Sequence, residues 1–210
     1  MRKLIFLMLL LTAVAAFAGD KKPQPTLLAR PNQTVEIKGL KVPALAQKCE
    51  NFGWAAGVEL MLRMQGVVLD QRYWVTKMDG GELCITQLRT MEELAKIVDG
   101  EYILDVARKV RLRARYTNGA PAVLDDLIVS IREASPWLFL WKGHPYLAYA
   151  MTYDEFIGPN NARIFMVREI KLIDPLVSED DPQRKVSFVR DRDNLAEVDG
   201  TMRVQATPIE

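Results

Sequence analysis

Three positions in the sequence carry side chains that could do chemistry together. Gln47 stands shortly before an apolar run that begins at Trp54. His144 is the only histidine and separates two apolar stretches, and Asp174 ends the next one. A carboxylate can orient an imidazole that acts as a general base, and a side-chain amide can donate to an oxyanion. These residue types fit the needs of acyl transfer, provided that a nucleophile lies beside them.

Taken singly, each of these residues also has an ordinary structural interpretation. A Gln before a helix is usually solvated, and a His beside Gly in a strand turn is more often structural than catalytic. Asp-Pro at the end of a strand is a common start of a turn. Only their order along the chain favours a shared site.

Hydrophobic periodicity predicts the elements that would position these residues. Apolar residues with a helical period predict helices over 54–65, 90–98 and 124–134. Thr90, with Glu93 three residues later, forms a candidate capping box. Strands are expected over 35–42, 110–116, 137–141, 146–153, 164–173 and 186–189. Helices dominate the first half and strands the second, which predicts an α+β fold with N-terminal helices packed on a C-terminal antiparallel sheet.

One predicted strand has a row of basic side chains on a single face. Lys109, Arg111, Arg113 and Arg115 alternate there with apolar residues. A solvated face is the ordinary interpretation, and such a row also blocks edge pairing. The alternative is an anionic partner, such as a membrane surface or an acidic peptide, held through Arg111 and Arg113.

The N-terminus has the pattern of a cleavable signal peptide. Arg2 and Lys3 precede an apolar run, and Ala16-Phe17-Ala18 is a small-x-small cleavage site. We therefore expect a signal peptide over 1–18, a flexible lead-in over 19–34, and one domain over 35–210. The protein would be exported, either to a periplasm or outside the cell. No other stretch is apolar enough to span a bilayer.

Charge and cysteine content narrow the function further. Removing the first 18 residues takes away two of the 28 basic residues and leaves 27 acidic ones, for a net charge of −1. That balance argues against nucleic acid as the partner. Cys49 and Cys84 form an even pair, which in an exported chain indicates a disulfide rather than two free thiols. With one histidine a zinc site is hard to assemble, so no metal or cofactor is expected.

Together the motifs resemble the papain-like cysteine peptidases, especially the small bacterial group related to the bacteriocin-processing peptidases. In that family a Gln precedes a nucleophilic Cys, which Trp-Ala-Ala follows at the start of a helix. A Gly-His pair comes about ninety residues later between strands, and an Asn or Asp, often before Pro, completes the set. The same order runs here from Gln47 through His144 to Asp174. The resemblance implies that Gln47 is the oxyanion donor, His144 the general base and Asp174 the orienting residue.

The sequence departs from this family at the nucleophile. The nucleophile would stand six residues after Gln47, where the sequence has Gly53, followed by Trp54 in the cleft wall. Cys49 would lie about 6 Å away along a helix. A misplacement of about 1 Å can already cost 100-fold in rate. The resemblance also places a structural half-cystine near Cys49, with its partner in the region of Cys84.

We therefore expect an exported papain-like domain that has lost its nucleophile and binds a peptide or protein in the former substrate cleft. One alternative is an active secreted cysteine peptidase that uses Cys49 or an unconventional mechanism. Another is a structural secreted domain without a working cleft. The sequence names no ligand, pathway or oligomeric state.

Overall fold

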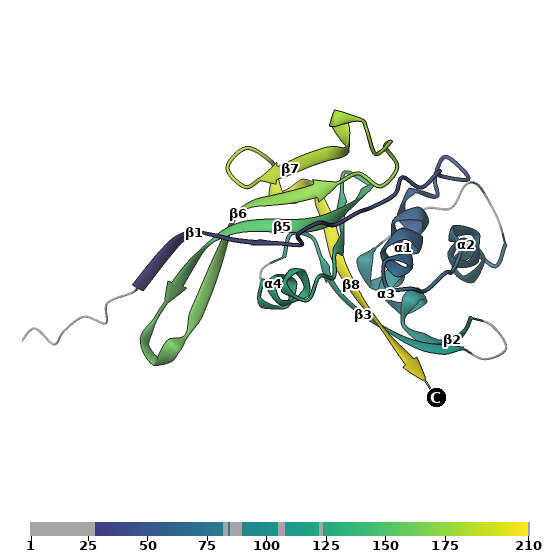
Figure 1. The fold of residues 1–210 in the computed structure, drawn as a ribbon, viewed down its shortest axis with the longest axis horizontal. Coiled ribbons are helices and arrows are strands. Elements are labelled where there is room, and N and C mark those ends of the chain that lie inside the picture. Colours follow the sequence, from purple (N-terminus) through teal and green to yellow (C-terminus); the bar gives the residue numbers. More distant parts are fainter. Residues whose placement is uncertain (1–27, 82–83, 85–89, 105–107, 122–123, 210) are drawn as a thin grey trace, which may run out of the picture.

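The computed structural model describes residues 28–81, 84, 90–104, 108–121 and 124–209 of the chain. These residues form an α+β fold in which four α-helices pack on one antiparallel sheet of eight strands (Figure 1). The α+β class expected from the sequence is confirmed. The expected signal peptide, residues 1–18, and residues 19–27 of the expected lead-in lie outside the described residues.

Helices and strands alternate along the chain, whereas the sequence pattern indicated helices mainly in the first half and strands in the second. The helices are α1 (Gly53–Arg63), α2 (Gln71–Asp79), α3 (Met91–Val98) and α4 (Asp125–Arg132). The strands are β1 (Leu28–Glu36), β2 (Gly100–Ile103), β3 (Lys109–Asn118), β4 (Trp137–Trp141), β5 (His144–Ile157), β6 (Arg163–Ile173), β7 (Lys185–Val189) and β8 (Val198–Ile209). In none of the described helices is there a segment long and apolar enough to cross a membrane.

The sheet has the strand order β2-β3-β8-β4-β5-β6-β7, and β1 also pairs with β5. One edge of β5 is shared, because β4 pairs with its residues 144–148 and β1 with its residues 150–157. The outer part of β5 therefore projects from the body together with β1 and β6 (Figure 1). We call residues 28–36, 150–157 and 163–168 the arm.

Helices cover both faces of the sheet. On one face α1, α2 and α3 bury apolar side chains against β3, β4 and β8, with Leu112, Leu138 and Met202 in that core. On the other face α4 packs against the sheet, with Ile128 and Trp137 in a second core. The sequence pattern predicted helices packed on an antiparallel sheet and did not assign them to its faces.

Side-chain caps mark the start of two of the four described α-helices, α2 and α3. The Thr90 hydroxyl accepts a hydrogen bond from the backbone N–H of Glu93 at 3.1 Å, so the expected N-cap of α3 is confirmed. Asp70 caps α2 in the same way by accepting from the N–H of Arg72 at 2.9 Å. The predicted strand over 35–42 is wrong in its bounds, because the strand is β1, and residues 28–34 of the expected lead-in belong to it.

Candidate functional site

A cleft of about 560 Å³ opens beside the N-terminus of α1. Its walls come from the segment before α1, the start of α1, the start of α3, the hairpin between β4 and β5, the end of β3, the start of β8 and the segment after β6. The lining residues are Gln47, Glu50, Asn51, Gly53, Trp54, Thr90, Met91, Asn118, Leu140, Gly143, His144, Pro145, Leu176 and Asp199. The cleft thus brings Gln47, Gly53 and His144 together from distant parts of the sequence.

A tight hairpin places His144 at the cleft. Trp141 pairs with His144 across β4 and β5, which leaves Lys142 and Gly143 as a two-residue loop. Both loop residues have positive φ, 55° and 72°, as a type I′ turn requires. The Gly143 N–H donates to Oδ2 of Asp199 at 2.8 Å, so the loop is also fixed to β8. The histidine therefore begins β5 at a defined position.

Asp174 holds the imidazole from the neighbouring strand. Its Oδ2 lies 2.8 Å from Nε2 of His144, and its Oδ1 accepts from the N–H of Leu176 at 2.9 Å. Its own N–H donates to the carbonyl of Arg184 at 2.7 Å. Asp174 is buried, whereas 38% of the His144 side chain is exposed. When Nε2 donates to this carboxylate, the lone pair of the ring lies on Nδ1, the nitrogen that is then able to accept a proton.

Tyr146 packs its ring beside that of His144. Its ring centroid lies 4.7 Å from that of His144. Burial raises the pKa of the Tyr146 hydroxyl, and the negative charge of Asp174 raises it further. The phenol therefore stays neutral beside the imidazole.

Gly53 begins α1 directly against the histidine hairpin. A Cβ atom built on Gly53 would lie 3.3 Å from Cδ of Pro145, the residue after His144, and 3.7 Å from Oε1 of Gln47. A side chain at position 53 would therefore project into the cleft between Gln47 and the hairpin. Trp54 lines the same cleft and is 4% exposed.

The Gln47 amide is oriented differently from what an oxyanion donor needs. Its Nε2 donates to the carbonyl of Cys49 at 2.6 Å and also to the carbonyl of Glu50. The amide oxygen is the atom near position 53. Gln47 thus lies beside position 53, and its N–H groups hold the backbone before α1.

A buried amide clamps the backbone on both sides of Gln47. Gln71, which is fully buried, accepts from the N–H of Lys48 at 3.0 Å and donates to the carbonyl of Ala46 at 3.1 Å. The buried carboxylate of Glu59 accepts a hydrogen bond from the backbone N–H of Gln71 at 3.0 Å. The other carboxylate oxygen of Glu59 lies 2.5 Å from the guanidinium of Arg63. The sequence analysis missed this network, although Glu59 is a lone acid within the apolar run of α1.

A disulfide joins Cys49 to Cys84, as the sequence predicted. Their Cα atoms are 5.3 Å apart, and Nδ2 of Asn51 donates to the Cys84 carbonyl at 3.3 Å. The bond ties the segment before α1 to the part of the chain that precedes α3. Cys49 therefore carries no thiol in this structure.

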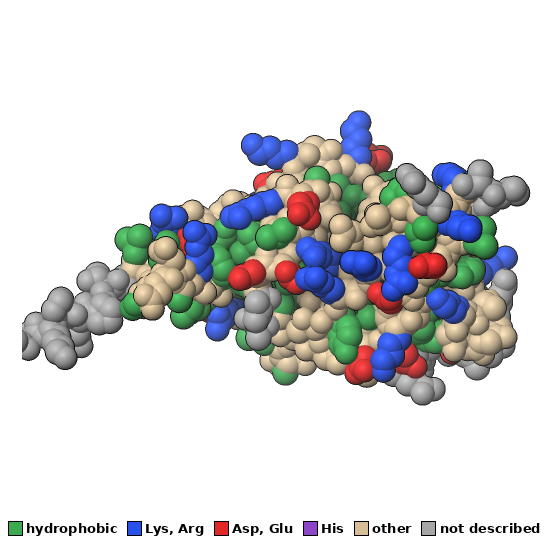
Figure 2. All heavy atoms as spheres, turned by 90° about the horizontal axis from the view of Figure 1, so that it is seen from below, with side chains coloured by type: hydrophobic (Ala, Val, Ile, Leu, Met, Phe, Trp, Pro, Cys, Tyr) green, Lys and Arg blue, Asp and Glu red, His purple; other side chains and the backbone are tan. Residues whose placement is uncertain are grey.

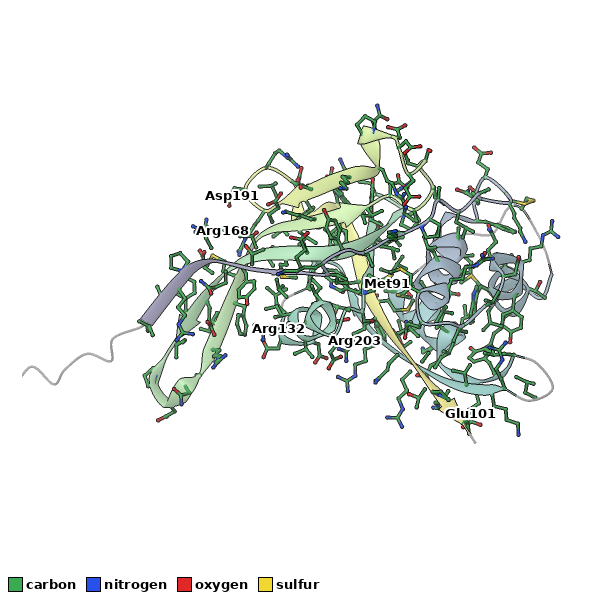
Figure 3. All side chains as sticks on the ribbon, viewed as in Figure 1. Met91, Glu101, Arg132, Arg168, Asp191 and Arg203 are labelled. Carbon is green, nitrogen blue, oxygen red and sulfur yellow. A yellow bond between two sulfur atoms is a disulfide. The ribbon has the colours of Figure 1, made fainter. Side chains whose placement is uncertain are left out.

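The basic row on β3 is partly neutralised. Arg111 lies 3.3 Å from Asp99 and 3.5 Å from Glu101, and Arg115 lies 2.9 Å from Asp126. Figure 2 shows basic side chains on this side of the molecule with acidic ones among them. Figure 3 places Arg203 of β8 near α4, where it donates to the Asp126 carbonyl at 3.2 Å. An anionic partner at Arg111 and Arg113 stays a prediction.

Comparison with known proteins gives this chain no family. No model of a protein family matches the sequence, and no curated protein matches it. Within the part of the chain that the structure describes, no group of three or more His, Cys, Asp or Glu side chains could hold a metal ion.

Proposed function

We propose that this chain is an exported papain-like domain in which Gly53 occupies the nucleophile position, and that its cleft holds a peptide without hydrolysing it. The observation that carries the proposal is the pairing of His144 with Asp174 beside Gly53 at the start of α1. A helix N-terminus that faces an oriented imidazole is the setting that favours a thiolate nucleophile. The shared cleft of Gly53 and His144 supports this setting, and position 53 carries no thiol.

The same geometry explains why the cleft would bind and not cleave. Acyl transfer needs a hydroxyl or thiol at position 53, and glycine has neither. The donors of the Gln47 amide are engaged with the backbone, so no side-chain N–H of Gln47 faces a carbonyl in the cleft. The apolar walls at Trp54 and Leu140 remain to hold an extended chain.

The disulfide counts against the alternative of a peptidase that uses Cys49. A sulfur that is bonded to Cys84 is not a nucleophile while that bond is intact. The disulfide also supports export, because such bonds persist in oxidising compartments.

Restoring a thiol tests the site directly. The wild-type protein should show no turnover of a broad peptide library. Gly53→Cys should react with iodoacetamide at pH 6, and the further change His144→Ala should slow that reaction about tenfold, because the thiolate loses its imidazole partner. Equal rates with and without His144 would show that the imidazole does not serve position 53. Peptide turnover by the wild type that Cys49→Ser abolishes without unfolding would favour the alternative.

Blocking the cleft tests the binding role. Gly53→Gln places a side chain in the cleft and should abolish peptide binding in a fluorescence anisotropy assay. Gly81→Gln is the matched control, because apart from the adjoining residues no described part of the chain comes within 4 Å of a Cβ at Gly81. Equal peptide affinity of the two variants would rule out the cleft as the binding site.

A further inference from the structure

The charged side chains that line the cleft are acidic. Glu50 comes from the segment before α1, and Asp199 comes from the start of β8. No Lys or Arg is found among the described residues of the lining. The cleft therefore has negative charge on two walls that are formed by different parts of the fold.

Neither carboxylate is neutralised by a cation in the described part of the chain. The Asp199 carboxylate accepts one hydrogen bond, from the neutral N–H of Gly143. Both side chains belong to exposed residues. Several other acids of the protein do have basic partners: Glu155 lies 3.2 Å from Arg163, and Glu197 lies 3.1 Å from Lys142. The cleft acids differ from these in having no basic partner.

Apolar surface lies beside the two carboxylates. Leu176 lines the cleft and is partly exposed, and the largely buried side chains of Trp54 and Leu140 add to the lining. Met91 is fully buried on α3 beside β8 (Figure 3). Lys and Arg side chains bury their methylene stems along apolar surface and leave the charged group at a polar one. A concave wall of one charge also focuses its field and concentrates ligands of the opposite charge.

We infer that the cleft selects peptides with basic side chains, whose cationic groups Glu50 and Asp199 pair with while the stems lie against the apolar wall. This inference rests on the proposed peptide-binding function and adds the chemical class of the ligand. An Arg guanidinium fits either carboxylate with two parallel hydrogen bonds. Peptides with acidic side chains are repelled by the same two groups.

The test uses three fluorescein-labelled decapeptides of Ala, Leu and Gly that differ only in carrying two Arg, two Gln or two Glu. Anisotropy titrations at low salt should give the Arg peptide an affinity about tenfold above that of the Gln peptide, as two exposed ion pairs would provide. The Glu peptide should bind most weakly. Raising the salt to 0.5 M should reduce the differences between the peptides.

Two double variants test whether Glu50 and Asp199 cause the preference for the Arg peptide. Glu50→Gln with Asp199→Asn removes both charges and keeps an acceptor for the Gly143 N–H, so the advantage of the Arg peptide should disappear. Asp125→Asn with Glu133→Gln removes two exposed acids near α4, on the other face of the sheet, and should change nothing. Equal binding of all three peptides would overturn the inference and leave the proposed function standing. Failure of every peptide to bind would overturn both.

Discussion

Gly57 lies so close to Leu138 that a Cβ built on the glycine would approach Cδ1 of the leucine to 2.8 Å. The same Cβ would lie 3.1 Å from Cβ of Pro145. α1 therefore packs backbone to side chain against the strands that carry the histidine hairpin. This contact keeps the N-terminus of α1 in place beside His144.

The two glycines of α1 should respond differently to alanine. Overpacking costs about 1–3 kcal/mol, which outweighs the roughly 1 kcal/mol that alanine gains over glycine in a helix. Gly57→Ala should therefore lower the free energy of unfolding, measured with urea. Gly53→Ala, whose Cβ meets Pro145 at 3.3 Å, should stay within about 1 kcal/mol of wild type. A Gly57→Ala variant more stable than wild type would contradict the packing.

Removing the Gln71 amide should lower the free energy of unfolding and also disturb the position of Gln47 in the cleft. Gln71→Leu leaves the Ala46 carbonyl and the Lys48 N–H without this partner, at about 1–3 kcal/mol for each group that stays buried. Gln65→Leu is the matched control, since Gln65 holds Val204 and Ala206 of β8 in the same way, outside the cleft lining. Both variants should be less stable. Only Gln71→Leu should alter the reactivity of a thiol at Gly53→Cys.

The disulfide should contribute a large share of the stability. It closes a loop of 35 residues, which the chain-entropy argument relates to about 4 kcal/mol. The double change Cys49→Ser and Cys84→Ser should lower the free energy of unfolding by about 2–4 kcal/mol. Mass spectrometry of natively exported, unreduced protein should find the two peptides linked. Two freely alkylated cysteines there would count against the bond.

The arm should loosen in acid through Asp154. Hydrogen bonding to Arg168, at 2.8 Å from Nε, holds the pKa of this carboxyl below its usual 3.8, and the N–H of Asn32 donates to its other oxygen at 3.0 Å. Because the pKa of Asp154 is lower in the folded state than in the unfolded state, its ionised form stabilises the fold, and this contribution is complete at a pH above the unfolded pKa. That stability is lost as the pH falls from about 5 through the folded pKa.

Hydrogen-exchange protection of the arm amides, corrected for the intrinsic rate, should therefore fall in this acidic range while α1 keeps its protection. Asp154→Asn is the control, because it retains an acceptor for Asn32 and has no carboxyl to titrate. The response of the arm should be much weaker in that variant. An unchanged response would assign the effect to other carboxyls.

Sequence pattern predicted the segments that have a regular apolar period and missed those whose burial depends on distant partners. α1 and the strand pair around His144 are strongly apolar and were found. α2 was missed because Gln71, Trp74 and Val75 are its only buried residues, too few for a clear helical period. β8 was missed because Gly200 and polar residues interrupt its apolar positions.

In the candidate site, too, the sequence predicted some features and missed others. The order of Gln47, His144 and Asp174 along the chain indicated a common location. In the structure Gln47 and His144 line one cleft, and Asp174 lies within hydrogen-bond distance of His144. The direction of the Gln47 amide and the clamp by Gln71 depend on backbone groups that meet only in the folded chain. No local pattern records those contacts.

The position of β8 in the sheet has a consequence for the order in which the chain can fold. This last described strand lies between β3 and β4, so it joins the half that contains β2 and β3 to the half that contains β4 to β7. During synthesis, which begins at the N-terminus, the two halves of the sheet keep open edges until residues 198–209 have been made. Open strand edges are the places where unfinished chains aggregate. Completion of this fold is therefore a late event, and a factor that protects the nascent protein would need to cover β3 and β4 first.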